Sequence, residues 1–122
     1  MRPYAWIRAN TSADDVFLAS ADVALRVVGP AGRKVVVAGP VYSNPYVDWE
    51  ARSRSSRRMW RALREGDSST LQTLARTADV TYVINWRQED PAIDDLLAEG
   101  NLPGLEPAFK SGGLRIFRLA SS

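Results

Sequence analysis

The hydrophobic residues of the chain fall into three short, mostly apolar runs and several longer stretches with helical spacing. The three runs are Val16–Ala19, Lys34–Val37 and Thr81–Ile84, and they are rich in β-branched and aromatic residues. Such runs, separated by helical stretches, are typical of the central strands of a parallel sheet. We therefore predict that these three strands run parallel to one another. The segment Ala24–Gly29 fits either a further strand or a short helix followed by a strand.

The helical stretches are bounded by residues that favour helix starts and ends. Asp90 followed by Pro91 indicates a helix start, because the carboxylate accepts free N–H groups and proline fits the first turn. Gly66 and Gly100 indicate helix ends. The predicted helices are a short one ending near Asn10, a long one from roughly Val47 to Glu65, one capped by Asp67 or Ser68, and one from Asp90 to Gly100.

The C-terminal segment "LEPAFKSGGLRIFRL" alternates hydrophobic and polar residues on both sides of a glycine turn, which predicts an antiparallel hairpin. Strands that alternate with helices indicate a sheet covered on both faces. The predicted fold class is therefore α/β: a three-layer sandwich with a Rossmann- or flavodoxin-like, mostly parallel sheet, finished by the hairpin. The length of 122 residues predicts a single domain, residues 1–122.

The composition excludes several kinds of chemistry. The chain contains no cysteine and no histidine, so a disulfide framework, a thiolate or histidine metal site and a Ser-His-Asp triad are all excluded. We predict no cofactor and no metal, since only weak oxygen-ligand sites remain open. The net charge of +2 does not by itself indicate a polyanionic partner. No apolar run reaches the ~20 residues that span a bilayer.

Neither phosphate-loop motifs nor paired carboxylates stand out as catalytic signals. The glycines of "GPAGRK" precede a strand rather than a helix, which favours a turn with Pro30 over a nucleotide loop. The acidic pairs Asp14-Asp15 and Asp94-Asp95 are sequence neighbours, and such neighbours do not face each other on a helix or strand. We interpret both pairs as structural or solvated.

An arginine-rich helix and a polar loop remain as candidate surfaces. The basic helix surface consists of Arg54, Arg57, Arg58 and Arg61. Its arginines occupy the polar arc while the tryptophans follow the apolar stripe, and acidic residues flank the run. This favours a solvated or partner-facing side, with acidic lipid headgroups as a further possibility, over nucleic acid, which we do not expect as a partner.

The loop follows the carboxyl end of the strand that begins at Lys34. It contains Tyr42, Ser43, Asn44 and Tyr46, with Arg33 expected behind or beside them. Ligands bind at this edge of open α/β sheets, so these five residues form a candidate ligand or partner surface. The alternative is structural: Asn44 caps the following helix and the tyrosines pack against it.

Four segments resemble a known family. "WIRANTSADDVFLAS", "GPAGRKVVVAGPVYSNPYVDW", "LARTADVTYVINW" and "GLEPAFKSGGLRIFRL" look like the C-terminal soluble domain of multi-spanning bacterial membrane proteins. These are lipid-phosphate-sugar-dependent, glycosyltransferase-like proteins. The sequence departs from the family pattern at Ser12 and Ala13, where Thr-Pro or Pro-Pro is usual, and in "ADVTYVI", where the family has "GVTYVV".

The resemblance implies a non-catalytic, extracytoplasmic domain that supports substrate or partner recognition at the outer face of the cell membrane. It implies that the chain is a segment of a longer protein, with Met1 an expression start. The partner would be the membrane-spanning half of that protein, and lipid headgroups or a glycan substrate are further candidate partners. From a different class, a free-standing small-ligand or nucleotide-binding α/β module stays open as the alternative. A self-contained enzyme is not expected.

Overall fold

A five-stranded mixed sheet organises the chain. The computed structural model describes residues 3–20, 23–36, 49–100, 102 and 104–119. The sheet has the strand order β2-β1-β3-β5-β4. The strands are β1 (Val16–Leu18), β2 (Lys34–Val36), β3 (Tyr82–Trp86), β4 (Leu105–Ser111) and β5 (Leu114–Leu119). Strand β1 pairs in parallel with both β2 and β3, whereas β5 is antiparallel to β3 and β4. The predicted parallel centre and the C-terminal hairpin are therefore confirmed.

Five helices accompany the strands in the described part of the chain. They are α1 (Pro3–Asn10), the π-helix η1 (Ala24–Val28), α3 (Trp49–Arg64), α4 (Ser68–Thr77) and α5 (Pro91–Glu99). The alternative that 24–29 forms a strand is wrong. Val23 and Val28 are both buried while Arg26 is exposed, and the five-residue spacing of the valines suits one face of a π-helix.

The helix boundaries follow the predicted capping residues. The Asp67 carboxylate accepts a hydrogen bond from the Thr70 N–H at 3.1 Å, and Asp90 accepts one from the Ile93 N–H at the same distance. Gly100 ends α5 with φ +70°, in the left-handed region that disfavours other residues. These local signals explain why α4 begins, and why α5 begins and ends, where the sequence indicated.

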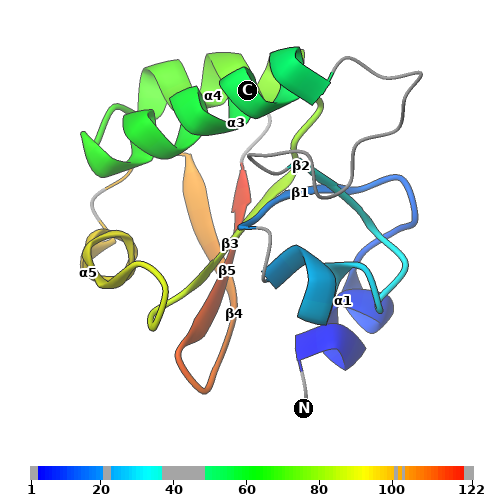
Figure 1. Cartoon of the computed structure of the whole chain (residues 1–122). Coiled ribbons are helices and arrows are strands. Elements are labelled where there is room, and N and C mark those ends of the chain that lie inside the picture. Colours follow the sequence, from blue (N-terminus) through cyan, green and yellow to red (C-terminus); the bar gives the residue numbers. More distant parts are fainter. Residues whose placement is uncertain (1–2, 21–22, 37–48, 101, 103, 120–122) are drawn as a thin grey trace.

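Two separate hydrophobic clusters cover the two faces of the sheet, because side chains alternate along each strand. On one face, Leu18 of β1 and Val83 of β3 pack with buried residues of α3, α4 and α5. On the other face, Phe17 and Ile84 pack with residues of α1 and η1. Figure 1 shows α3 and α4 on the opposite side of the sheet from α1. The chain is thus a mixed α/β fold with helices on both faces of a mixed sheet.

Candidate functional site

Arg33 lies at the C-terminal end of α1, where it serves as a cap. Its Nε donates a hydrogen bond to the Thr11 hydroxyl, and its Nη2 donates one to the Thr11 carbonyl, both at 2.9 Å. Further donors of Arg33 reach the carbonyls of Arg8 and Ala31, each at 3.3 Å. The last carbonyls of a helix lack intrahelical partners, and a cation there also complements the helix dipole. These contacts give Arg33 a structural role.

The other members of the predicted loop surface, Tyr42, Ser43, Asn44 and Tyr46, lie in 37–48, outside the described residues. The structure therefore leaves both interpretations of that loop open as predictions.

Aromatic contacts dock α1 against the sheet. Trp6 stacks on Phe109 of β4, with ring centroids 5.3 Å apart, and meets the edge of Tyr82 of β3 at 6.4 Å. Tyr82 in turn stacks on Phe17 of β1 at 5.0 Å. The Thr81 hydroxyl also donates to the Asp15 carboxylate at 3.2 Å, which joins the entry to β1 with the entry to β3. Trp6 thus fixes α1 directly to β3 and β4, two strands that are distant from it in sequence, and Tyr82 extends the aromatic contacts to β1.

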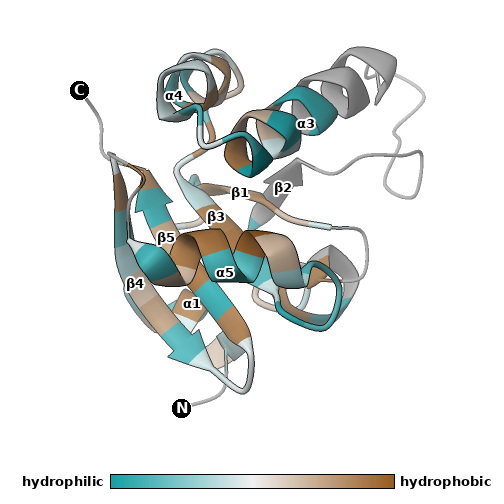
Figure 2. Ribbon diagram, turned by 90° about the vertical axis from the view of Figure 1, so that its left-hand side faces the viewer, coloured by the Kyte–Doolittle hydropathy of each residue, from teal (hydrophilic) through white to brown (hydrophobic). Residues whose placement is uncertain are grey.

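The basic helix surface is partly described. Arg57, Arg58 and Arg61 are exposed on α3, while Met59 and Leu63 of the same helix are buried in the core. Figure 2 shows hydrophilic bands along the described part of α3. Arg54 belongs to α3, but its side chain is outside the described residues. For the three described arginines, the prediction that they face away from the core is confirmed.

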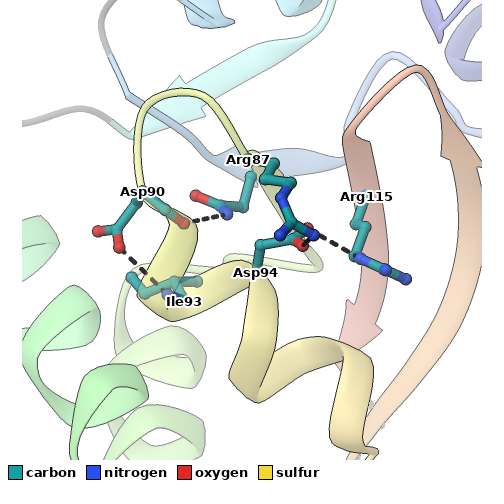
Figure 3. Close-up of polar contacts among 6 residues, drawn as sticks. Arg87, Asp90, Ile93, Asp94 and Arg115 are labelled. Atoms are coloured by element: carbon teal, nitrogen blue, oxygen red, sulfur yellow. Dashed lines mark hydrogen bonds and ion pairs between the residues drawn. The ribbon is translucent and has the colours of Figure 1, made fainter.

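A cluster of charged side chains at the carboxyl end of β3 was not predicted as a site. Asp94, in the first turn of α5, is only 1% exposed. One of its carboxylate oxygens accepts from Arg115 Nε at 2.8 Å, and the other accepts from Arg87 Nη1 at 3.3 Å. Figure 3 shows both arginines reaching the carboxylate from different elements, the β3–α5 turn and β5. Asp94 is therefore structural, as expected, whereas its neighbour Asp95 is exposed.

The surrounding backbone holds this cluster in place. The Asn85 amide donates to the Asp90 carbonyl at 3.2 Å, and Asn85 is only 5% exposed. The Arg87 N–H donates to the Gly113 carbonyl at 2.8 Å, which ties the β3–α5 turn to the hairpin tip. No sequence motif marks this arrangement. The β3–β5 register, which sets Asn85 opposite Arg115, brings Arg115 to Asp94.

A second polar contact lies where β1 and β3 end. The Ser20 hydroxyl donates to the Glu89 carboxylate at 2.6 Å and accepts from the Val23 N–H at 3.2 Å. In open α/β sheets the carboxyl ends of adjacent strands whose connections diverge form the usual ligand crevice. Ser20 and Glu89 mark that position in this sheet.

Metal-ligating side chains do not gather in the described part of the chain. Within it, no group of three or more His, Cys, Asp or Glu residues is arranged to hold a metal ion.

No protein-family model matches the chain, and no curated protein matches it in sequence. None of the helices in residues that the structure describes has the length and apolar character needed to cross a membrane.

Proposed function

We propose that the chain is the non-catalytic, extracytoplasmic domain of a multi-spanning, lipid-phosphate-sugar-dependent glycosyltransferase-like protein, where it supports substrate or partner recognition. The observation that carries this proposal is the meeting of all four family-like segments around α1. Trp6 comes from the first segment, Arg33 from the second, Tyr82 from the third and Phe109 from the fourth. Trp6 contacts both other aromatic rings, and Arg33 caps α1 through Thr11.

This arrangement suits a domain whose first helix carries the connection to a membrane-spanning half. The last carbonyls of α1 are held by Arg33, and its apolar side is held by Ile7, which is fully buried. A helix fixed at both its end and its side positions the sheet relative to whatever the helix is attached to. The proposed partner is accordingly the membrane-spanning half of the same protein.

The basic helix surface is proposed to face that membrane half or its lipid headgroups. Exposed arginines near a membrane are attracted to anionic headgroups, by about 1 kcal/mol for each charge close to the surface. Arg57, Arg58 and Arg61 present such charges on α3. Nucleic acid is not proposed as a partner.

The finer fold assignment, a three-layer Rossmann- or flavodoxin-like sandwich, is also part of this proposal. Two observations support it: the strand order β2-β1-β3, and helices on opposite faces of the sheet. Right-handed crossover connections that run in opposite directions across the sheet place their helices on opposite faces. The antiparallel β5 is the departure from that class.

Site-directed labelling in intact cells tests the proposed location. These 122 residues contain no cysteine, so Arg58→Cys places a single exposed thiol in this domain, on α3, once any cysteines elsewhere in the gene product are replaced by serine. We expect the gene product in the membrane fraction, with Arg58→Cys labelled by a membrane-impermeant maleimide before lysis. Ala62→Cys, buried on the same helix, is the matched control and should remain unlabelled. Labelling of Arg58→Cys only after lysis would overturn the location.

A transfer assay tests the non-catalytic role. The chain is mixed with a polyprenyl-phosphate sugar donor and a glycan acceptor, and we expect no sugar transfer. Transfer by the chain alone would refute the role, whatever its location.

The alternative, a free-standing small-ligand or nucleotide-binding module, is favoured by one contact. Ser20 and Glu89 meet at 2.6 Å where ligands of such sheets bind, and a carboxylate there suits ribose or other hydroxyl groups. An NMR titration with a nucleoside panel tests it. Saturable shifts at Ser20 that disappear in Glu89→Gln would favour this alternative, and an unchanged spectrum would reject it.

A further inference from the structure

A row of polar side chains crosses three strands at the hairpin end of the sheet. Arg115 of β5 pairs in register with Asn85 of β3 on one side and with Lys110 of β4 on the other. Directly paired residues share a face of the sheet, so Lys110 lies beside Arg115 on the face that Asp94 covers. Lys110 is exposed. Two cations are thus direct cross-strand neighbours, an arrangement that destabilises a sheet unless negative charge offsets it.

The negative charge that the described residues supply here is smaller than the positive charge. Asp94 is one carboxylate, and it is shared between Arg87 and Arg115. Lys110 adds a third cation beside Arg115, and no further ion pair to any of these three cations occurs among the described residues. The cluster therefore carries an excess of positive charge at a defined place, the junction of the hairpin tip with the β3–α5 turn.

The guanidinium group of Arg115 is held in position, and some of its N–H groups make no hydrogen bond to the described residues. Asp94 takes the Nε of Arg115, which fixes the plane of the guanidinium. Figure 3 shows the terminal nitrogens of Arg115 directed away from the Asp94 carboxylate. Within the described residues no acceptor is recorded for these nitrogens. The side chain of Arg115 is 18% exposed and that of Arg87 is 60% exposed, so solvent and small anions reach both.

We propose that Arg87, Lys110 and Arg115 form a binding site for a phosphate group, with Asp94 as the residue that positions the two arginines. The terminal nitrogens of Arg115 match two oxygens of a phosphate, which guanidinium groups bind in a bidentate manner. Lys110 supplies a point charge and Arg87 a second guanidinium for the remaining oxygens. A dianionic phosphomonoester or pyrophosphate balances the excess charge better than a monoanionic carboxylate.

This inference is independent of the proposed function and of the basic helix surface. The site lies on β4, β5 and the β3–α5 turn, whereas the arginines of the basic helix surface lie on α3. It predicts binding by the chain itself, whether or not a membrane half is attached.

The first experiment measures binding of inorganic phosphate and pyrophosphate to the chain by NMR titration at constant ionic strength. We expect saturable shifts of the Arg87, Lys110 and Arg115 amides. Lys110→Gln, at an exposed position that does not contribute to the core, should weaken binding about tenfold, the effect of one charge-assisted hydrogen bond. Arg118→Gln is the matched control. Arg118, on β5, is exposed like Lys110, and its replacement removes the same charge. Its affinity should equal that of the original chain.

The positioning role of Asp94 has its own readout. Asp94→Asn should weaken pyrophosphate binding and also broaden or shift the Arg115 Nε–H resonance, because that proton loses its charged acceptor. If Asp94→Asn does not fold, the Lys110→Gln and Arg87→Gln variants, both at exposed side chains, still decide the proposal. Equal phosphate affinity in those two variants and in Arg118→Gln would overturn it.

A second experiment distinguishes a lipid headgroup from a free phosphate. Phosphatidylcholine vesicles doped with phosphatidic acid present a phosphomonoester, and vesicles doped with phosphatidylglycerol at equal charge present a phosphodiester. Loss of phosphatidic acid binding in Lys110→Gln assigns the site to a headgroup. Lys110-dependent binding of free pyrophosphate without vesicle binding assigns it to a soluble phosphate. Absence of any Lys110-dependent binding in both formats refutes the site.

Discussion

Replacing Arg33 with lysine tests whether the end of α1 depends on the guanidinium group. Arg33 makes two hydrogen bonds of 2.9 Å to Thr11 and two longer ones of 3.3 Å to the carbonyls of Arg8 and Ala31. The lysine ammonium is a compact point charge on a flexible chain and cannot reach acceptors spread across the guanidinium plane. We expect it to keep one of the two short bonds and to lose the rest.

The size of the effect follows from those contacts. A hydrogen bond to a charged group contributes roughly 1.5–3 kcal/mol to stability. One short bond is lost outright and the longer bonds are weak, while the side chain is only half-buried. We therefore expect Arg33→Lys to lower the free energy of unfolding by about 2 kcal/mol. For a chain of 122 residues this corresponds to a decrease in Tm of roughly 6–10 °C.

Urea denaturation followed by circular dichroism measures this loss, and hydrogen exchange locates it. The exchange of the Thr11 amide, which donates to the Ile7 carbonyl at 3.0 Å, should accelerate more than that of β5 amides. Arg26→Lys is the control, because Arg26 is exposed and such surface changes stay within about 0.5 kcal/mol. A loss in Arg33→Lys no larger than in Arg26→Lys would show that the cap does not hold α1.

Three further predictions concern helix ends and the core. Hydrogen bonds from the Thr70 side chain and backbone hold the pKa of Asp67 below its usual 3.8. The Asp67 carboxylate therefore stabilises the fold above that pH, and the stabilisation is lost as the pH falls through the lowered pKa. The urea midpoint of Asp67→Ala should lie below that of the original chain at pH 7 and converge with it in acid. Gly100→Ala should destabilise by about 1 kcal/mol because φ is +70°, with Gly100→Asn less affected in the same melt. Phe17→Ala should cost about 3–5 kcal/mol in chemical denaturation, whereas Tyr4→Ala at an exposed ring should cost little.

Local signals in the sequence predicted helix ends and buried strands, because capping residues and apolar runs determine the structure of the segment in which they stand. Asp90 and Gly100 act on their own helix within a few residues, so the bounds of α5 could be predicted without tertiary information. The apolar run at β3 likewise predicted a buried central strand, and Val83 and Ile84 are fully buried. The π-helix η1 was not predicted, because the two buried valines, Val23 and Val28, are five residues apart and fit neither a strand nor an ordinary helix.

Side-chain partners distant in sequence could not be predicted. The hydrogen bonds of Arg33 to Thr11, 22 residues earlier, follow from no pattern in the sequence, and the expected place of Arg33 behind or beside the loop stays a prediction. The Asp94 cluster depends on the β3–β5 register, which places Arg115 opposite Asn85. A shift of one residue would turn Arg115 to the other face and leave Asp94 without that partner. Sequence patterns specify which face of a strand is apolar, but not which polar side chains from different elements contact each other.

The helix α5 makes two different kinds of contact with the sheet. Ile93 and Leu97 join the hydrophobic core, whereas Asp94 joins the arginines at the carboxyl end of β3. Buried ion pairs contribute little net stability, since desolvation offsets most of the attraction, and apolar residues of similar volume often stabilise a fold as well or better. The polar contact is therefore not needed to attach α5, which Ile93 and Leu97 already anchor. What an apolar replacement cannot reproduce is a fixed pair of guanidinium groups open to solvent, and that property is the one a phosphate site requires.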